Sequence, residues 1–199
     1  MGKAEENKLH KKNSLLATAF ELFTTKGLSK TSISDIVEKA GVAKGTFYLY
    51  FKDKYDLQEK LIVYKAQKLF DHAMKYSGYD SKPTFSEKII VIVDDLLKEM
   101  SKDPLLVRFI DKNLSWGLFH KTLERPDVQE KLNYTQVLQD ALEADKCEWI
   151  EPQIMLYTIV TLVGSTCHSV ILEHDPVDLE SYKPFLFESI RSIVKVHQR

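Results

Sequence analysis

Apolar residues recur at three- and four-residue intervals near the start of the chain, which is the spacing of one face of an α-helix. The residues with this spacing are Leu15, Leu16, Ala19, Phe20, Leu22 and Phe23. They predict an amphipathic helix from about Lys8 to Thr25. Gly27 follows, and glycine ends helices readily because it adopts the left-handed backbone conformation at little cost.

Two shorter helices are predicted directly afterwards. Ser32-Ile33-Ser34-Asp35 has the pattern of a capping box, which opens a helix that we expect to end near Lys39, before Gly41. A second short helix is expected over about 44–50, and Asp53 caps a longer one. Two short helices joined by a tight turn form a helix-turn-helix, across which the first helix packs. Such hairpins also occur in proteins that never bind DNA, so the pattern alone leaves DNA binding open.

The turn and the second short helix carry a distinctive set of residues: Ala40-Gly41-Val42, Lys44-Gly45, Tyr48, Phe51, Lys54 and Leu57. This set resembles the DNA-binding domain of the TetR family of bacterial regulators, over about residues 15–61. The resemblance implies a three-helix DNA-binding domain followed by a helical ligand-binding and dimerisation domain. Ala43 departs from the family pattern of serine or threonine, and alanine cannot cap a helix, which costs about 1 kcal/mol.

The resemblance also identifies the expected DNA contacts, which are Thr31, Ser32, Lys44, Gly45, Thr46, Tyr48, Tyr50 and Lys54. Glycine at position 45 lets the backbone approach the major groove, and the lysine and tyrosine side chains can donate to phosphates. Phe47 and Phe51 are expected in the core. Arg108 is the first arginine of the chain. Lysine must therefore replace the bidentate arginine–guanine contact, and DNA shape should supply more of the discrimination.

Charge divides unevenly along the chain. Residues 1–65 hold 12 lysines and 8 acidic residues, whereas the remainder holds 16 basic and 21 acidic residues. A basic N-terminal region on an acidic body is typical of a nucleic-acid reader with a separate second domain. A solvated lysine face gives the same balance, so charge by itself does not decide between the two interpretations.

The rest of the chain is expected to be helical as well, because only 7 glycines and 6 prolines interrupt 199 residues. We expect a DNA-binding domain over 1–54, a connecting helix over 55–76 and a ligand-binding and dimerisation domain over 77–199. The helices expected in the last region are 84–101, 104–120, 127–144, 152–174 and 184–197. Pro104 and Pro184 suit first-turn positions, where a missing amide leaves nothing unpaired.

The segment 152–172 contains no charged residue and is long enough to cross a bilayer. Its seven serine, threonine, glutamine and histidine residues favour a helix buried inside a helical protein instead. One domain could hardly cover both this helix and the apolar helix at 184–197. A four-helix dimer interface would cover them, and the resemblance implies the same arrangement.

A small-molecule site is expected where aromatic and polar residues share the helices at 104–120 and 152–174. The candidate effector-binding residues are Phe109, Asn113, Trp116, Phe119, His120, Tyr157, Thr161 and His168. Packing of a solid core explains the same stripe of residues. In a TetR regulator, however, part of this core is a cavity for a ligand, so both interpretations stay open.

The sequence shows no catalytic motif, no phosphate-binding loop and no zinc-ligand spacing, so no catalytic residue, metal or cofactor is expected. Cys147 and Cys167 form no CxxC pair, which favours a reducing cytosol and leaves a redox role open. The charged N-terminus lacks the apolar run of a signal peptide. We therefore expect a cytoplasmic, homodimeric DNA-binding regulator, a repressor released by an apolar or amphipathic effector. The alternatives are an enzyme or a protein-interaction adaptor built on the same scaffold; the effector, the operator and the sign of regulation stay open.

Overall fold

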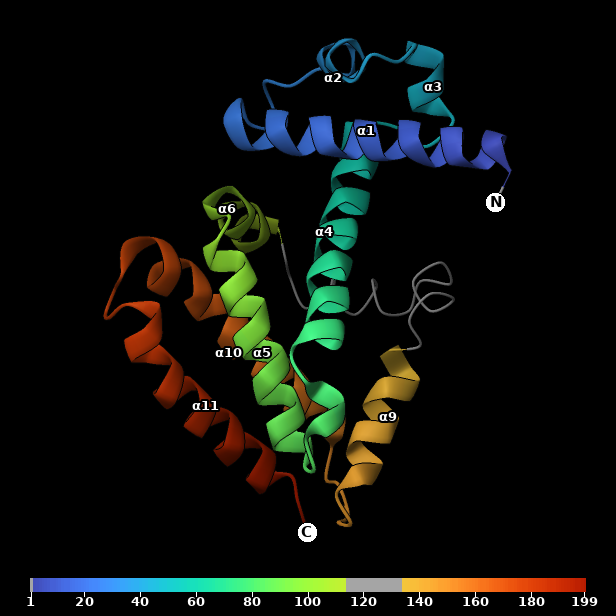
Figure 1. Ribbon diagram of the computed structural model, residues 1–199. Helices are drawn as coiled ribbons and strands as arrows, with labels where there is room; N and C mark the ends of the chain where they lie inside the picture. Colours follow the sequence, from blue (N-terminus) through green and yellow to red (C-terminus); the bar gives the residue numbers. More distant parts are fainter. Residues whose placement is uncertain (1, 114–133) are drawn as a thin grey trace. The chain divides into compact units, whose positions relative to one another are not determined.

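The computed structural model describes residues 2–113 and 134–199, and the regular elements in these ranges are all helices (Figure 1). The expectation of an all-α fold is confirmed. The chain divides into two compact units, Met1–Lys65 and Ala66–Arg199. Helix α4 (Lys54–Tyr76) contributes its first half to the first unit and its second half to the second unit.

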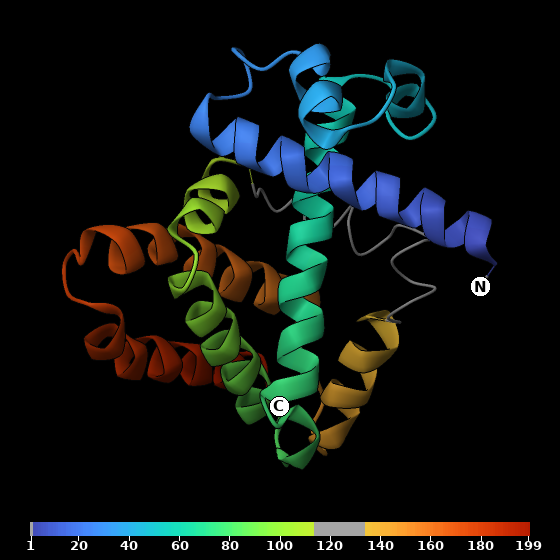
Figure 2. The same cartoon turned by 45° about the horizontal axis from the view of Figure 1, so that its top comes forward.

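The first unit contains α1 (Lys3–Thr25), α2 (Ile33–Ala40), α3 (Lys44–Tyr48) and the start of α4. Figures 1 and 2 show α2 and α3 on the same side of α1. The residues that make the core of this unit are Leu15, Leu16, Ala19, Leu22, Phe23, Ile36, Val37, Phe47, Phe51, Leu57 and Leu61. Helix α1 begins five residues before the expected Lys8, because its first turns consist of exposed helix formers without apolar periodicity.

Local caps set the ends of these helices, as the sequence predicts. The Ser32 hydroxyl accepts from the Asp35 amide at 3.1 Å, and the Asp35 carboxylate accepts from the Ser32 amide at 2.8 Å. Gly27 and Gly41 follow α1 and α2 with φ of 85° and 66°, values that residues with a Cβ rarely adopt. The Asp53 carboxylate accepts from the amides of the first turn of α4.

The second unit contains the end of α4 and the helices η1 (Tyr79–Ser81), α5 (Phe85–Ser101), α6 (Pro104–Asn113), α9 (Tyr134–Ala144), α10 (Pro152–His168), η2 (Ser169–Glu173) and α11 (Leu179–Val196). Helix α5 packs against α6, α9 and α11, and α10 packs against α6 and α11. The expected helices at 104–120 and 127–144 lie partly outside the described residues. Pro104 opens α6 as expected.

Pro184 does not open a helix, contrary to the expectation. Helix α11 begins at Leu179, because the Asp178 carboxylate accepts from the Ser181 amide at 3.0 Å and caps an earlier turn. Pro184 therefore lies inside α11. Its neighbour Lys183 is 5% exposed, and its ammonium donates to Asp94 on α5 at 3.1 Å and to Glu180 at 2.7 Å.

This buried contact shifts the titration of both partners. Burial acts to raise the pKa of Asp94, but hydrogen bonds from Lys98 and Lys183 outweigh it and leave that pKa below its ordinary value. Burial acts to lower the pKa of Lys183, and the hydrogen bonds to Glu180 and Asp94 outweigh it, so that pKa is raised. The pair is thus charged at neutral pH and links α11 to α5.

Candidate nucleic-acid interface and ligand cavity

Helix α3 is the second helix of the helix-turn-helix, and the Gly41 turn sets where it begins. The Val42 amide donates to the Val37 carbonyl at 3.0 Å, which closes the end of α2. Ala43 then precedes α3 and supplies no side-chain cap, as the sequence predicts. Lys44 and Gly45 are exposed at the start of α3, Thr46 is half-buried, and a Cβ added at Gly45 would meet open space.

Buried and exposed aromatic residues alternate at the end of α3. Phe47 is fully buried, and its ring lies 5.5 Å from the ring of Phe51, so both belong to the core as expected. Tyr48, the next residue, is 53% exposed, and Leu49 is 78% exposed. Leu49 is not among the DNA contacts expected from the sequence. The signal was present, because Phe47 and Phe51 already occupy the inward positions on either side of it.

Three other expected DNA contacts have partners inside the first unit. The Tyr50 hydroxyl donates to the Lys8 carbonyl at 3.1 Å. Thr31 is 1% exposed, and its hydroxyl donates to the Gly27 carbonyl at 2.8 Å. Ser32 is exposed, but its hydroxyl caps α2. Hydrogen bonding to the Ser32 amide, and then to its side chain, holds the pKa of Asp35 below its ordinary value.

Lys54 also has partners inside the first unit. Its ammonium donates to the carbonyls of Leu28 at 2.9 Å, Ser29 at 3.3 Å and Thr31 at 3.1 Å. An ammonium group has three donors, and all three are used here. Lys54 therefore joins α4 to the loop between α1 and α2 in this structure, and its expected phosphate contact stays a prediction.

Comparison with known proteins identifies the kind of domain that contains this surface. The sequence profile described as "Bacterial regulatory proteins, tetR family" matches residues 15–61, which include α2, α3 and their flanking turns. The HTH-type transcriptional regulator YvdT of Bacillus subtilis (strain 168) is 29% identical over 191 residues, which cover 89% of this chain and 91% of YvdT. Residues 15–61 form a DNA-binding domain of the TetR family.

Two further matches extend the similarity to the second unit. A probable acrEF/envCD operon repressor of Escherichia coli (strain K12) is 24% identical over 184 residues, covering 87% of this chain and 80% of that protein. The crystal structure of FadR from Bacillus subtilis in complex with stearoyl-CoA shares the fold, with a TM-score of 0.63, 19% identity, and coverage of 91% of this chain and 98% of FadR. This chain is a DNA-binding transcriptional regulator.

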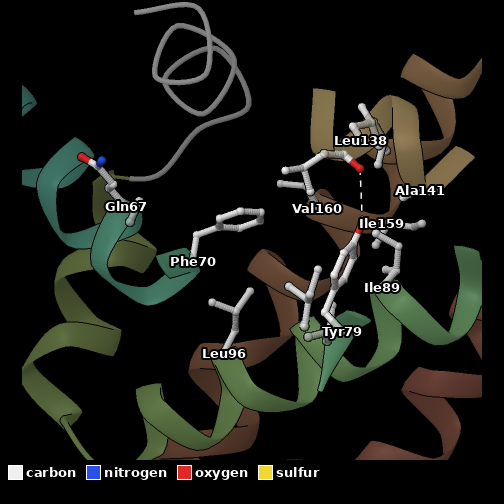
Figure 3. Close-up of a pocket in the computed structure, with 14 residues that line it drawn as sticks. Gln67, Phe70, Tyr79, Ile89, Leu96, Leu138, Ala141, Ile159 and Val160 are labelled. Atoms are coloured by element: carbon white, nitrogen blue, oxygen red, sulfur yellow. Dashed lines mark hydrogen bonds between the residues drawn. The ribbon is translucent and has the colours of Figure 1, made fainter. Parts of the chain in front are cut away.

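A cavity of about 200 Å³ lies inside the second unit, between the end of α4, η1, α5, α9 and α10 (Figure 3). The residues that line it are Ala66, Gln67, Phe70, Tyr79, Ile89, Ile92, Val93, Leu96, Val137, Leu138, Ala141, Leu156, Ile159 and Val160. The lining is almost entirely apolar. The Tyr79 hydroxyl donates to the Val137 carbonyl of α9 at 3.2 Å, and burial, followed by the charges of Asp80 and Asp140, raises the pKa of Tyr79.

The expected effector-binding residues do not line this cavity. Phe109 is buried in the core, whereas Tyr157 and Thr161 are exposed on α10. His168 is half-buried, with Nδ1 4.0 Å from the Glu173 carboxylate. The other four expected residues cannot be placed: Trp116, Phe119 and His120 lie outside the described residues, as does the side chain of Asn113. Within the described ranges, no group of three or more histidine, cysteine, aspartate or glutamate residues could hold a metal ion.

Helices α10 and α11 each expose an apolar face. Pro152–Glu173 is long and apolar enough to cross a membrane, which is weak evidence because core helices of soluble proteins have the same length and composition. Only 22% of its most apolar window is buried within the described chain, which agrees with the expectation that one domain does not cover this helix. On α11, Phe185 is 72% exposed and Val196 is 74% exposed.

Proposed function

We propose that this regulator is a cytoplasmic, homodimeric repressor that leaves its operator when a small amphipathic effector enters the second unit. The cavity of the second unit is the observation that carries the proposal. Interiors are normally packed without voids much larger than a water molecule, so a partly open apolar pocket of about 200 Å³ is unfavourable unless a ligand fills it. Release by a ligand requires no catalytic group, and the regulator acts by binding alone.

The chemistry of the lining limits what the effector can be. An apolar cavity of about 150 Å³ binds a molecule of the size of benzene, so this somewhat larger space suits an aromatic ring or a short alkyl chain. A charged group would lose its hydration there without gaining a partner. The effector therefore has an apolar part that enters the cavity and a polar part that stays outside it. Stearoyl-CoA, held by the FadR relative, is amphipathic in the same sense.

The effector acts by preferring one arrangement of the second unit. Side chains of α4, α5, α9 and α10 meet at the cavity, and α4 also supplies residues to the DNA-binding unit. A ligand that binds one arrangement of these helices more tightly shifts the population toward it, by no more than its difference in affinity. The favoured arrangement is one in which the two DNA-binding units of the dimer no longer fit the operator.

Dimerisation accounts for the apolar faces of α10 and α11. These helices pack against each other within one protomer, yet Ile154, Phe185 and Val196 stay exposed. Two such helices from each protomer would form a four-helix interface and remove these side chains from water. A two-fold dimer presents two copies of α3, which requires a pseudo-palindromic operator.

Base reading is assigned to the exposed start and end of α3. Lys44, Gly45 and Thr46 are placed to meet base edges, while Tyr48 and Leu49 can contact thymine methyl groups or phosphates. Ser32 and Tyr50 are assigned to backbone contacts. A helical enzyme or an adaptor would not need an exposed lysine and an open glycine side by side at the start of this helix.

The test begins with selection of DNA sequences by the purified protein, followed by binding measured by fluorescence anisotropy. The operator complex is then titrated with fatty acids of four to twelve carbons. Each added methylene should improve release about fourfold, equivalent to about 0.8 kcal/mol, until the cavity is filled. Beyond that length the gain should stop. Release that is independent of chain length, or release by sugars alone, would contradict the effector class.

A further inference from the structure

The face of α1 that packs into the first unit continues toward the N-terminus beyond the core. Residues three or four apart lie on the same face of a helix. Lys12 and Lys8 therefore lie on the same face of α1 as Leu16 and Leu15, and Lys11 is next to them. Lys8 and Lys11 are exposed, and Lys12 is half-buried. The core-facing stripe thus changes from apolar residues to lysines at the end of the packed region. We call these three residues the N-terminal lysine patch.

No described residue neutralises this patch. No ion pair or hydrogen bond joins the ammonium groups of Lys8, Lys11 and Lys12 to any part of the chain that the structure describes. The nearby Glu5 carboxylate instead accepts from the Gly2 amide at 3.3 Å, at the start of α1. Like charges three and four residues apart destabilise a helix. Residues that destabilise their own helix are expected where a surface binds a charged partner.

Two hydrogen bonds fix where the patch lies. The Tyr50 hydroxyl donates to the Lys8 carbonyl at 3.1 Å, and the Lys60 ammonium donates to the Tyr50 carbonyl at 3.0 Å. Tyr50 follows the end of α3, so α1 is tied at Lys8 to the end of the DNA-reading helix. Both ribbon views show α3 next to the N-terminal half of α1 (Figures 1 and 2). The patch therefore lies near the end of α3.

We infer that the N-terminal lysine patch binds DNA phosphates that flank the bases met by α3, and so lengthens the footprint of each DNA-binding unit. The inference rests on DNA binding by α3 as proposed above. DNA phosphate is the partner because lysine ammonium groups bind phosphates as point charges, and such contacts carry no base specificity. Residues 1–65 contain no arginine, so lysines alone supply this electrostatic contact.

The test compares wild type with Lys8→Ala/Lys12→Ala on two duplexes, one trimmed to the selected operator and one with ten extra base pairs on each side. Wild type should bind the longer duplex more tightly, and the variant should lose this preference. The slope of log affinity against log salt should fall by about 2 for each occupied half-site, since each lost phosphate contact contributes about 0.9. The enriched base sequence should not change.

Lys146→Ala/Lys195→Ala removes two exposed lysines of the second unit and controls for total charge. The melting temperature of the patch variant should not fall, because a repulsion on α1 is relieved. An unchanged salt slope and an unchanged preference for the longer duplex, in a variant that still binds the operator, would overturn the inference. Failure of wild type to bind any DNA would instead overturn the proposed function, so the two failures are distinct.

Discussion

The two units of the molecule are held together in different ways. In the first unit, short helices begin and end at local caps: the Ser32–Asp35 pair, Gly41 in the left-handed conformation, and Asp53 at the start of α4. In the second unit, longer helices pack around a cavity of about 200 Å³ and leave apolar faces on α10 and α11 uncovered.

This difference matches what each unit has to do. A surface that reads DNA must hold its side chains in one geometry, and the caps and the fully buried Phe47 provide that. A unit that responds to a ligand must have more than one arrangement of similar free energy. Unfilled space and uncovered apolar faces are the physical features that permit it. Substitutions that are equivalent in type should therefore have opposite effects in the two units.

Substitution of two adjacent aromatic residues of α3 should give the largest difference in stability. Phe47→Ala removes a fully buried ring and should cost about 3–5 kcal/mol of unfolding free energy, with loss of DNA binding through unfolding of the first unit. Tyr48→Ala removes a ring that is 53% exposed and should change stability by less than about 0.5 kcal/mol while weakening DNA binding. Chemical denaturation and anisotropy check both. Equal destabilisation by the two changes would contradict the division of α3 into a core face and a DNA face.

Replacing a buried alanine with leucine should change the free energy of unfolding in opposite directions in the two units. Ala19 is fully buried in the packed first unit, so Ala19→Leu should cost about 1–3 kcal/mol. Ala141 lines the cavity, so Ala141→Leu should be neutral or stabilise by about 0.5–1 kcal/mol. It should also reduce the response to fatty acids without changing operator affinity. A large loss of stability in Ala141→Leu would mean that the cavity is not available space.

Lys54 and Lys44 separate structural lysines from DNA-binding lysines. Lys54→Met removes the ammonium from three backbone carbonyls, of which that of Leu28 keeps the Thr31 amide, and should cost about 1–3 kcal/mol of stability. Lys44→Met should leave stability within about 0.5 kcal/mol, because its side chain is exposed. Thermal melts of the two variants make the comparison. A stable Lys54→Met protein with weakened DNA binding would support the phosphate role expected from sequence.

Acid should weaken the second unit through Asp94. Its pKa is depressed below the ordinary 3.8, so its contribution to stability is complete above about pH 4 and is lost as the pH falls through the folded-state pKa. Asp94→Asn should flatten the pH dependence of unfolding free energy below pH 4, by at most about 1 kcal/mol because the carboxylate is partly exposed. Denaturant titrations from pH 2.5 to pH 6 measure this. An unchanged acid slope would show that the contacts of Asp94 with Lys98 and Lys183 contribute nothing to stability.

The first unit could be predicted closely because its helix ends depend on residue types that favour caps and turns. Ser32, Asp35, Gly27 and Gly41 are the residues that caps and left-handed turns demand, and each does what the sequence predicts. The contacts of Lys54 with three carbonyls could not be predicted, because a lysine at a helix start has the same sequence whether its ammonium binds a phosphate or backbone carbonyls. Only the position of the loop between α1 and α2 decides between them.

The cavity of the second unit could not be predicted in the same way. Periodicity identifies which face of a helix is apolar, but not whether the faces of two helices meet tightly or leave space between them. Ile89, Ile92, Val93 and Leu96 follow the helical spacing of ordinary core residues and line the cavity. Phe109 and Tyr157 also fit a cavity by chemistry, yet one packs in the core and the other is exposed. Long-range packing sets these outcomes.

The central claim is that the exposed start of α3 reads DNA, and one comparison tests it most directly. Operator affinity and base preference are measured for Lys44→Ala and for Lys39→Ala, which removes an equally exposed lysine that pairs with Glu21 on α1. Lys44→Ala should weaken binding to the selected operator about tenfold or more and relax base preference, because a base contact contributes about 1–3 kcal/mol. Lys39→Ala should change affinity less than threefold. Equal effects of the two substitutions, or no effect of Lys44→Ala, would contradict the claim.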